Sequence, residues 1–357
     1  MKKSIKRIVL CTAIIAGAVI VLAAGFFGFL TIAEYRPADI ETLEINNPVQ
    51  RRPATGLPIS ILSWNIGYAS LDESQDFFMD GGKNIRPASS ANVTRNISAI
   101  KEFIHSAGCD IVIVQEADIR SRRSYYVDQR AYLAENFSGS SAFAYNFRCA
   151  FVPFPFPEFI GRVSSGLLTL NSFDSVEALR LSLSNPFSWP VRTANLKRCL
   201  LVSRIPLEDS AAELVLVNLH LEAYDSSGGR EAQTAMLLDF LYSEYAKGNY
   251  CVAGGDFNQN FPGIDAGRFA IKNSDYFVPG TLKPSLLAEG WRFAADTQTP
   301  SCHLLNEPYS GDPDTTQLYV IDGFILSPNV EPVSVQTVDM GFKYSDHNPV
   351  QLEIKLK

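Results

Sequence analysis

The longest apolar stretch of the chain lies near its N-terminus, where residues 8–32 contain no charged side chain. About 20 apolar residues suffice for a helix to cross a bilayer, whereas the apolar region of a signal peptide spans only ~7–15 residues. The stretch therefore predicts a transmembrane helix within an uncleaved membrane anchor, residues 1–33. A signal that is cleaved to release a secreted protein is the alternative.

Charge on either side of this stretch predicts its orientation. Basic residues precede it (Lys2, Lys3, Lys6 and Arg7) and acidic residues follow it (Glu34, Asp39, Glu41 and Glu44). Positive charge is retained on the cytoplasmic side of a membrane. We therefore expect a single-pass protein of the cell membrane, whose main domain lies outside the cytoplasm.

Beyond the anchor, prolines and mixed polar residues in 34–56 predict a tether. From residue 57 to 357, short apolar runs alternate with amphipathic patterns, and no break in composition divides this region. Residues 91–108 and 229–249 carry the helical period, and each pattern ends at a glycine. The other runs predict strands at 57–67, 109–116, 165–170, 176–183, 197–207, 212–223, 250–256, 318–327, 330–338 and 347–356. These helices and strands together predict one α/β domain with mixed sheets, which a long irregular stretch after Asn258 interrupts.

Composition narrows the possibilities further. Hydrophobic residues make up 46% of the chain, which supports a large core and excludes general disorder. The formal net charge of −7 disfavours unspecific binding of polyanions. Six cysteines include no C-x-x-C pair, so no zinc site is predicted. Cys149, Cys199 or Cys302 could pair in an oxidising compartment.

Polar residues recur where the predicted strands end. Any one of them could be a turn former or cap, but packed strands can bring their ends to one edge. Four carboxylates would meet there and repel one another unless a cation neutralised them, and oxygen ligands without cysteine favour a hard ion such as Mg²⁺. The residues are Asn65, Glu116, Asn218, His220, Asp256, Asn258, Asp322, Asp346 and His347.

The order of these motifs resembles a known family. "WN", "QE", "NLHL", "GGDFN", "IDG" and "SDHNPV" follow one another as in the endonuclease/exonuclease/phosphatase family, which is deoxyribonuclease I-like. The resemblance covers residues 57–357. It implies an α/β four-layer sandwich, in which two mixed β-sheets pack face to face with helices outside. It also implies metal-dependent hydrolysis of a phosphoester.

The resemblance assigns a role to each matching residue. Glu116 resembles the principal Mg²⁺ ligand, supported by Asn65 and Asp346, and Mn²⁺ is a possible substitute. Asp256 and Asn258 resemble the pair that orients the attacking water and binds a phosphoryl oxygen. His347 resembles the catalytic imidazole, Asp322 the carboxylate that orients it, and His220 a histidine placed on the phosphate. Arg198, Arg230 and His303 are weaker candidates for substrate binding.

The motifs do not distinguish between several classes of substrate. Asp118 stands where related nucleases carry an arginine soon after "QE", and no basic stripe is evident. A phosphodiesterase or nuclease, a phospholipid headgroup hydrolase and an inositol-phosphate phosphoesterase all fit the motifs. A binding module without activity is less consistent with them, and no protein partner is indicated. The aromatic stretch 147–163 is either an extended segment packed on a sheet or a rim that stacks bases or touches lipid.

Overall fold

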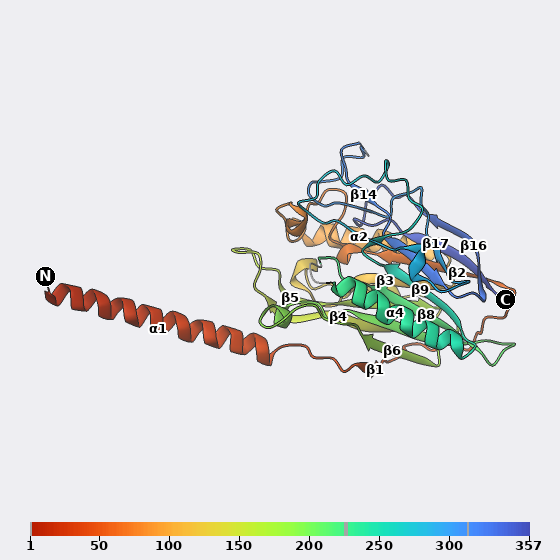
Figure 1. Cartoon of the computed structure of the whole chain (residues 1–357), viewed down its shortest axis with the longest axis horizontal. Coiled ribbons are helices and arrows are strands. Elements are labelled where there is room, and N and C mark those ends of the chain that lie inside the picture. The colour runs from red at the N-terminus through yellow and green to blue at the C-terminus, as the bar shows by residue number, and fades with distance from the viewer. Residues whose placement is uncertain (1, 225–227, 313) are drawn as a thin grey trace.

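The computed structural model describes residues 2–224, 228–312 and 314–357 (Figure 1). Its helices are α1 (Lys2–Ile32), α2 (Ser90–Ala107), α3 (Gln129–Ala134) and α4 (Gly229–Ala246). The longer strands are β2 (Pro58–Asn65), β3 (Ile111–Asp118), β4 (Ser140–Val152), β5 (Gly161–Asn171), β6 (Glu177–Ser182), β7 (Cys199–Pro206), β8 (Glu213–His220), β9 (Tyr250–Asp256), β15 (Asp322–Leu326), β16 (Val330–Thr337) and β17 (Val350–Leu356). The shorter ones are β1 (Ile40–Thr42), β10 (Gln259–Asn260), β11 (Gly280–Thr281), β12 (Arg292–Ala294), β13 (Cys302–His303) and β14 (Leu318–Tyr319).

Two mixed sheets form the body of the domain. One has the strand order β16-β17-β2-β3-β5-β4, and the other has the order β1-β6-β7-β8-β9-β15-β12. Each sheet contains one parallel pair, β2–β3 in the first and β8–β9 in the second. A parallel pair needs a crossover, and α2 and α4 provide these two connections.

The helices cover the outer faces of the sheets. Apolar residues of α2, such as Ile97 and Ile100, pack with Leu62 and Val112 of the first sheet. Leu237 of α4 packs with the second sheet. A separate cluster fills the space between the sheets, which gives the layers helix, sheet, sheet and helix. The predicted four-layer sandwich of two mixed sheets is confirmed.

Sequence patterns located the long strands but joined or missed several others. The expected strand 318–327 is divided into β14 and β15, which belong to different sheets. β4 was not predicted, although it pairs with β5 along nearly its whole length. Its sequence mixes phenylalanines with alanine, serine and arginine, so the apolar period is weak.

α1 extends away from the domain (Figure 1). Within the described residues, Ser4–Ile32 is the one helix that is long and apolar enough to cross a membrane, with a mean hydropathy of 2.7. Length and composition are also compatible with a signal sequence.

The segment predicted as a tether, 34–56, is packed against the domain. β1 lies antiparallel to β6, and Leu43 and Ile45 contact a cluster of buried residues between the sheets. Asn46 and Ser141 form a further bridge between the segment and β4. The connection between α1 and the sandwich therefore contacts both sheets, through β1 in the second sheet and Asn46 beside β4 of the first.

All cysteines in the described part of the chain are free thiols. Cys149, Cys199 and Cys302 are buried, and none of these candidates for pairing forms a disulfide.

Candidate active site

Strand register in the second sheet brings three distant residues together. Asp256, the last residue of β9, lies opposite His220 of β8 on one side and Asp322 of β15 on the other. Opposite residues on neighbouring strands project from the same face. The ring atom Nε2 of His220 lies 3.3 Å from Oδ2 of Asp256.

Close packing of the backbone makes this arrangement possible. Gly255 has φ +142°, and a Cβ atom there would lie 2.0 Å from the carbonyl oxygen of Leu219. Only glycine fits such an approach. The "GGD" sequence is therefore required by the pairing of β8 and β9, in addition to any role of Asp256.

A bulge in the first sheet directs Glu116 toward the same place. The pairing of β3 with β5 shifts between Val114 and Ala117, and Glu116 adopts a left-handed conformation with φ 58°. Bulges of this kind redirect a side chain, and strained conformations of non-glycine residues gather at functional sites. The Glu116 side chain remains 24% exposed, unlike the buried carboxylates around it.

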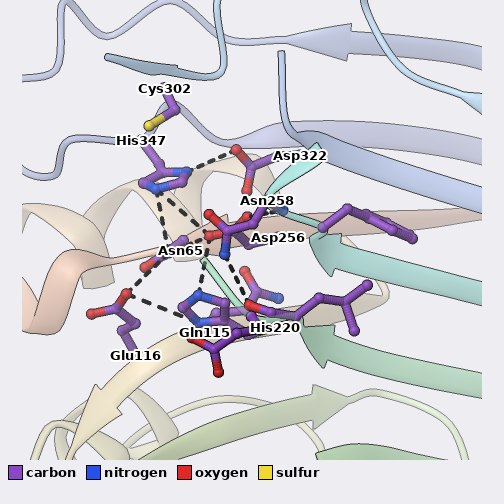
Figure 2. A network of polar contacts seen from close by, with 12 residues as sticks. Asn65, Gln115, Glu116, His220, Asp256, Asn258, Cys302, Asp322 and His347 are labelled. Carbon is purple, nitrogen blue, oxygen red and sulfur yellow. Dashed lines mark hydrogen bonds and ion pairs between the residues drawn. The ribbon is translucent and has the colours of Figure 1, made fainter. Parts of the chain in front are cut away.

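Asn65, at the end of β2, connects the two sheets (Figure 2). Its amide nitrogen lies 3.0 Å from Oδ2 of Asp256, 3.4 Å from Oε1 of Glu116 and 3.3 Å from Nε2 of His347. The residues predicted from the strand ends thus form one network.

His347 is held from two sides. Its Nδ1 atom lies 2.8 Å from Oδ2 of Asp322, and its backbone oxygen accepts a hydrogen bond from the indole of Trp64 at 2.9 Å. Burial alone would lower the pKa of His347, but the negative charge of Asp322, its hydrogen bond and the neighbouring Cys302 and Asp346 together outweigh burial and hold this pKa well above its usual range. The ring is therefore charged, with Nε2 directed toward Asn65 and Asp256 (Figure 2).

His220 differs from His347 in charge. Burial lowers its pKa well below the usual range, and the positive charges of Arg198 and His347 add to this effect. Because the imidazole is neutral, its 3.3 Å contact with Asp256 is not an ion pair. The site therefore combines one charged and one neutral histidine.

Asn258 is fixed by the backbone around it. Its own N–H donates to Oδ1 of Asp256 at 2.8 Å, and its side-chain amide donates to the carbonyl of Leu221 at 2.9 Å. Arg230 donates to the carbonyl of Asn258 at 2.6 Å, so this weaker candidate supports the Asn258 loop.

The positive charge of His347 lowers the pKa values of the neighbouring carboxyl groups of Asp256 and Asp346 but compensates for their burial only in part. Burial raises the pKa of Asp256 to about 7, and repulsion from Asp322 adds to it. Burial likewise raises the pKa of Asp346 to about 7, with further repulsion from Glu116 and Asp80. A divalent cation would remove this repulsion, and the oxygen donors suit a hard ion. The donor set therefore fits the predicted metal.

Two compact groups of possible metal ligands include His347. They are Asp256, Asp322 and His347, and Cys302, Asp346 and His347. A metal in the first group would have to replace the short contact between His347 and Asp322. Glu116 is more open, since its carboxylate borders the cavity beside Asn65.

A cavity of about 540 Å³ gives access to the network. Arg198 lines it, 95% buried, with Nε 3.6 Å from Oε2 of Glu222. Among the described residues, Nε and Nη1 of Arg198 have no hydrogen-bond partner. His303 also lines the cavity, packed against Tyr309 and Phe342, and burial lowers its pKa to about 4.

The sequence patterns did not predict two contacts of side chains that line this cavity. Arg123 forms a two-pronged ion pair with Asp118, at 3.0 and 3.2 Å, and lies 3.7 Å from the centre of the Tyr68 ring. Asp118, noted above only as a departure, therefore positions an arginine five residues later. Tyr224 donates to Asp80 at 2.7 Å, and no sequence signal pointed to that pair.

Comparison with known proteins supports the fold and the family. Three solved structures are similar at low sequence identity. An endonuclease/exonuclease/phosphatase from Beutenbergia cavernae is 18% identical, with TM-score 0.57, covering 84% of this chain and 72% of that one. A functionally unknown protein from Enterococcus faecalis is 16% identical, with TM-score 0.53, covering 84% of this chain and 100% of that one. An endonuclease/exonuclease/phosphatase from Bacteroides vulgatus is 17% identical, with TM-score 0.50, covering 84% of this chain and 100% of that one.

A search of curated proteins found no match. The sequence profile of the Endonuclease/Exonuclease/phosphatase family, however, matches residues 62–347, which include every residue of the network described above. The chain belongs to this family of hydrolases.

Proposed function

We propose that this protein is a Mg²⁺-dependent phosphodiesterase whose catalytic domain comprises residues 57–357. Members of its family hydrolyse phosphoester bonds and generally depend on a divalent metal ion. The observation that carries the proposal is the contact between His347 and Asp322 beside Asn65, Glu116 and Asp256 in one cavity. An inactive binding module would not need a charged imidazole with one nitrogen facing a cavity.

Glu116, Asn65 and Asp346 would hold the ion. When bound there, Mg²⁺ or Mn²⁺ would neutralise the negative charge that builds up on the phosphoryl oxygens during the reaction. Asn65 then has a second task, because its amide nitrogen donates to the carboxylates of both Glu116 and Asp256 and so fixes their separation.

The remaining residues handle water, phosphate and protons. Asp256 orients the attacking water, while His220 and Asn258 face the phosphoryl oxygens. His347 gives the proton on Nε2 to the leaving oxygen, and Asp322 holds the ring in position for this transfer. General acid–base catalysis of this kind typically supplies ~10²–10⁴-fold in rate.

Charge favours a phosphodiester over a phosphomonoester. The two arginines that line the cavity each face a carboxylate, Arg123 at Asp118 and Arg198 at Glu222. Little positive charge therefore remains for a doubly charged monoester, whereas a diester carries a single negative charge.

α1 supports a position at the cell membrane, with the domain outside the cytoplasm. The charge asymmetry around residues 8–32 is the basis for this orientation. Release after signal cleavage would place the same domain in the medium.

Hydrolysis of bis(p-nitrophenyl) phosphate by the purified full chain in Mg²⁺ tests the proposal. We expect release of p-nitrophenol well above background, and a loss of ~10²–10⁴-fold for His347→Ala. His105→Ala is the matched control, since His105 is an exposed histidine of α2. Equal rates for the wild type and His347→Ala would reject the proposal.

A further inference from the structure

The cavity that contains the catalytic network has largely apolar walls. The polar part of its lining includes Glu116, Asp256 and His347 of the network. The remaining lining is dominated by aliphatic and aromatic side chains, among them Leu71, Phe77, Phe147, Val152, Ile160 and Phe277. A site for nucleic acid needs basic groups along a backbone track. This cavity instead suits a ligand with a phosphate at one end and hydrocarbon at the other.

Several residues that line the cavity are also exposed. We call them, with two exposed aromatic neighbours, the apolar collar: Phe27, Met79, Phe154, Phe156, Trp189 and Val191. Phe156 is the most exposed, at 82%. Exposed apolar patches of this kind mark a surface that contacts a partner or a membrane.

The end of α1 forms part of the cavity wall. Phe27 and Leu30 line the cavity, and Leu30 is only 4% exposed. The Phe27 ring lies 5.9 Å from the Trp189 ring, and the Trp189 indole donates to Thr31 at 3.1 Å. The helix is therefore docked on the collar, while most of its length is exposed.

An ion cluster fixes this junction. Glu34, directly after α1, accepts from Lys197 at 3.1 Å and lies 3.4 Å from Arg192 and 3.1 Å from Arg36. The Glu34 side chain is 3% exposed. Three cations around one carboxylate leave positive charge beside the collar, where anionic lipid headgroups would lie.

Helix length places the collar at a bilayer surface. The span Ser4–Ile32 has 29 residues, which is about 43 Å of helix, longer than the ~30 Å hydrocarbon core. Its last turns, which contain Phe27 and Leu30, therefore reach the interfacial region. The loop between β4 and β5, which carries Phe154 and Phe156, projects on the side of the domain where α1 approaches (Figure 1).

We propose that the substrate is a phosphodiester lipid of the membrane that α1 spans, and that it reaches the site through the apolar collar. This inference rests on the proposed phosphodiesterase activity. The lipid phosphate would lie beside Glu116, His347 and Arg198, and its hydrocarbon would follow the apolar wall toward Phe27 and the bilayer. Aromatic side chains at the interface stabilise this orientation.

The reaction balances without a further reactant. Water adds to phosphorus, and one phosphorus–oxygen ester bond breaks. The proton of the water passes to Asp256, and the leaving alkoxide takes a proton from His347. The products are one alcohol and one phosphate monoester, and a proton exchanged with solvent restores both residues.

The test uses the full chain reconstituted in vesicles of phosphatidylcholine, phosphatidylethanolamine and phosphatidylglycerol, with sphingomyelin vesicles as a separate arm. Rates are compared for lipid, for bis(p-nitrophenyl) phosphate and for single- and double-stranded DNA. We expect lipid cleavage, detected as a water-soluble phosphate monoester or as phosphatidic acid. We expect little or no cleavage of DNA.

Collar variants separate membrane access from chemistry. Phe154→Ser combined with Phe156→Ser should lower the ratio of lipid to bis(p-nitrophenyl) phosphate turnover at least tenfold. Phe156→Ser alone should lower it in the same direction, and its exposure makes misfolding of this variant improbable. Val333→Ser is the matched control, because Val333 is 49% exposed on β16, at the opposite end of the domain from α1 (Figure 1).

The outcomes distinguish the two proposals. Cleavage of bis(p-nitrophenyl) phosphate or DNA without cleavage of any lipid would overturn the lipid assignment and leave the phosphodiesterase intact. Lipid cleavage with an unchanged ratio in both collar variants would overturn the route through the collar. Failure to cleave any of the substrates would overturn the phosphodiesterase itself.

Discussion

At the scale of single residues, the site depends on side chains that contact several other residues at once. Asn65 illustrates this, because its amide nitrogen lies within 3.4 Å of a glutamate in the bulge of β3, an aspartate at the end of β9 and a histidine in the segment before β17. Its neighbour Gln115 has the same kind of task deeper in the fold, where it donates to Asn218 at 2.8 Å between the two sheets. Side-chain amides thus connect the two sheets without adding charge.

The pair His347 and Asp322 gives the first prediction at this scale. His347→Ala should lower turnover by ~10²–10⁴-fold, because it removes the proton donor. Asp322→Asn should lower it less, since the ring remains but loses its orienting charge. The double variant should be little worse than His347→Ala, because residues that act as a unit are not additive. Steady-state kinetics on bis(p-nitrophenyl) phosphate measure all three.

A double variant whose loss equals the product of the single losses would show that the two residues act independently. The 2.8 Å contact between Nδ1 of His347 and Oδ2 of Asp322 would then have only a structural role. Thermal unfolding of each variant is the control, because a variant that unfolds near the assay temperature says nothing about catalysis.

At the scale of elements, the apolar patterns of β2, β3, β8, β9, α2 and α4 predicted an α/β domain with mixed sheets, and the family resemblance supplied its four layers. Their residues are buried on both faces or on one helical stripe, so local sequence carries the signal. The bulge at Glu116 and the split between β14 and β15 were not predictable, because each depends on pairing with a distant strand.

The same distinction applies to the site. Polar residues at strand ends predicted the network from Asn65 to His347, since strand ends converge in a packed sheet. Asp118 ends β3, whereas Arg123, Asp80 and Tyr224 lie outside the named strands and α-helices, and only the folded chain brings these last three side chains to the cavity wall. Sequence periodicity carries no information about such contacts.

A second prediction concerns the attachment of α4 to the second sheet. Glu244 of α4 accepts two hydrogen bonds from Arg204 of β7, at 2.8 and 2.9 Å. Burial alone would raise the pKa of Glu244, but hydrogen bonds from Arg204, Lys247 and Asn249 outweigh it and hold this pKa at about 2. Its unfolded-state pKa is near 4.5.

Because folding lowers this pKa, the carboxylate stabilises the fold fully above about pH 4.5. The contribution should be lost progressively as pH falls from there toward 2. Glu244→Gln should lower the free energy of unfolding at pH 7 by about 1.5–3 kcal/mol, the usual range for hydrogen bonds to charged groups. Urea denaturation across pH measures both effects.

Glu231→Gln is the control, since Glu231 is exposed in the first turn of the same helix. If the difference in stability between wild type and Glu244→Gln did not shrink between pH 4.5 and 2, the ion pair would not be the source of the effect.

At the scale of the whole molecule, the apolar helix α1 and the cavity of the candidate site are parts of one arrangement. α1 docks at the collar through Trp189, and the segment after it adds β1 to the second sheet. A loose tether would let the domain turn away from the bilayer. In the proposed membrane-anchored protein, an ordered junction would keep the cavity at a fixed height and orientation above the surface.

This arrangement gives a prediction of topology. A reporter fused after Lys357 should be active outside the cytoplasm, and the full chain should sediment with membranes until detergent is added. Deletion of residues 1–33 from a cytoplasmically expressed protein should remove that dependence on detergent. A soluble full chain with an intact N-terminus would contradict the assignment of α1 as an anchor.

The most direct test of the whole account is the dependence of phosphodiester hydrolysis on Mg²⁺ concentration, measured after treatment with a chelator. We predict that the wild-type rate falls to background in excess chelator and recovers when Mg²⁺ or Mn²⁺ is added. Glu116→Gln should need at least about tenfold more Mg²⁺ for half of its maximal rate, because it removes the charge of the proposed ligand. A wild-type rate that persists unchanged in excess chelator would contradict the account.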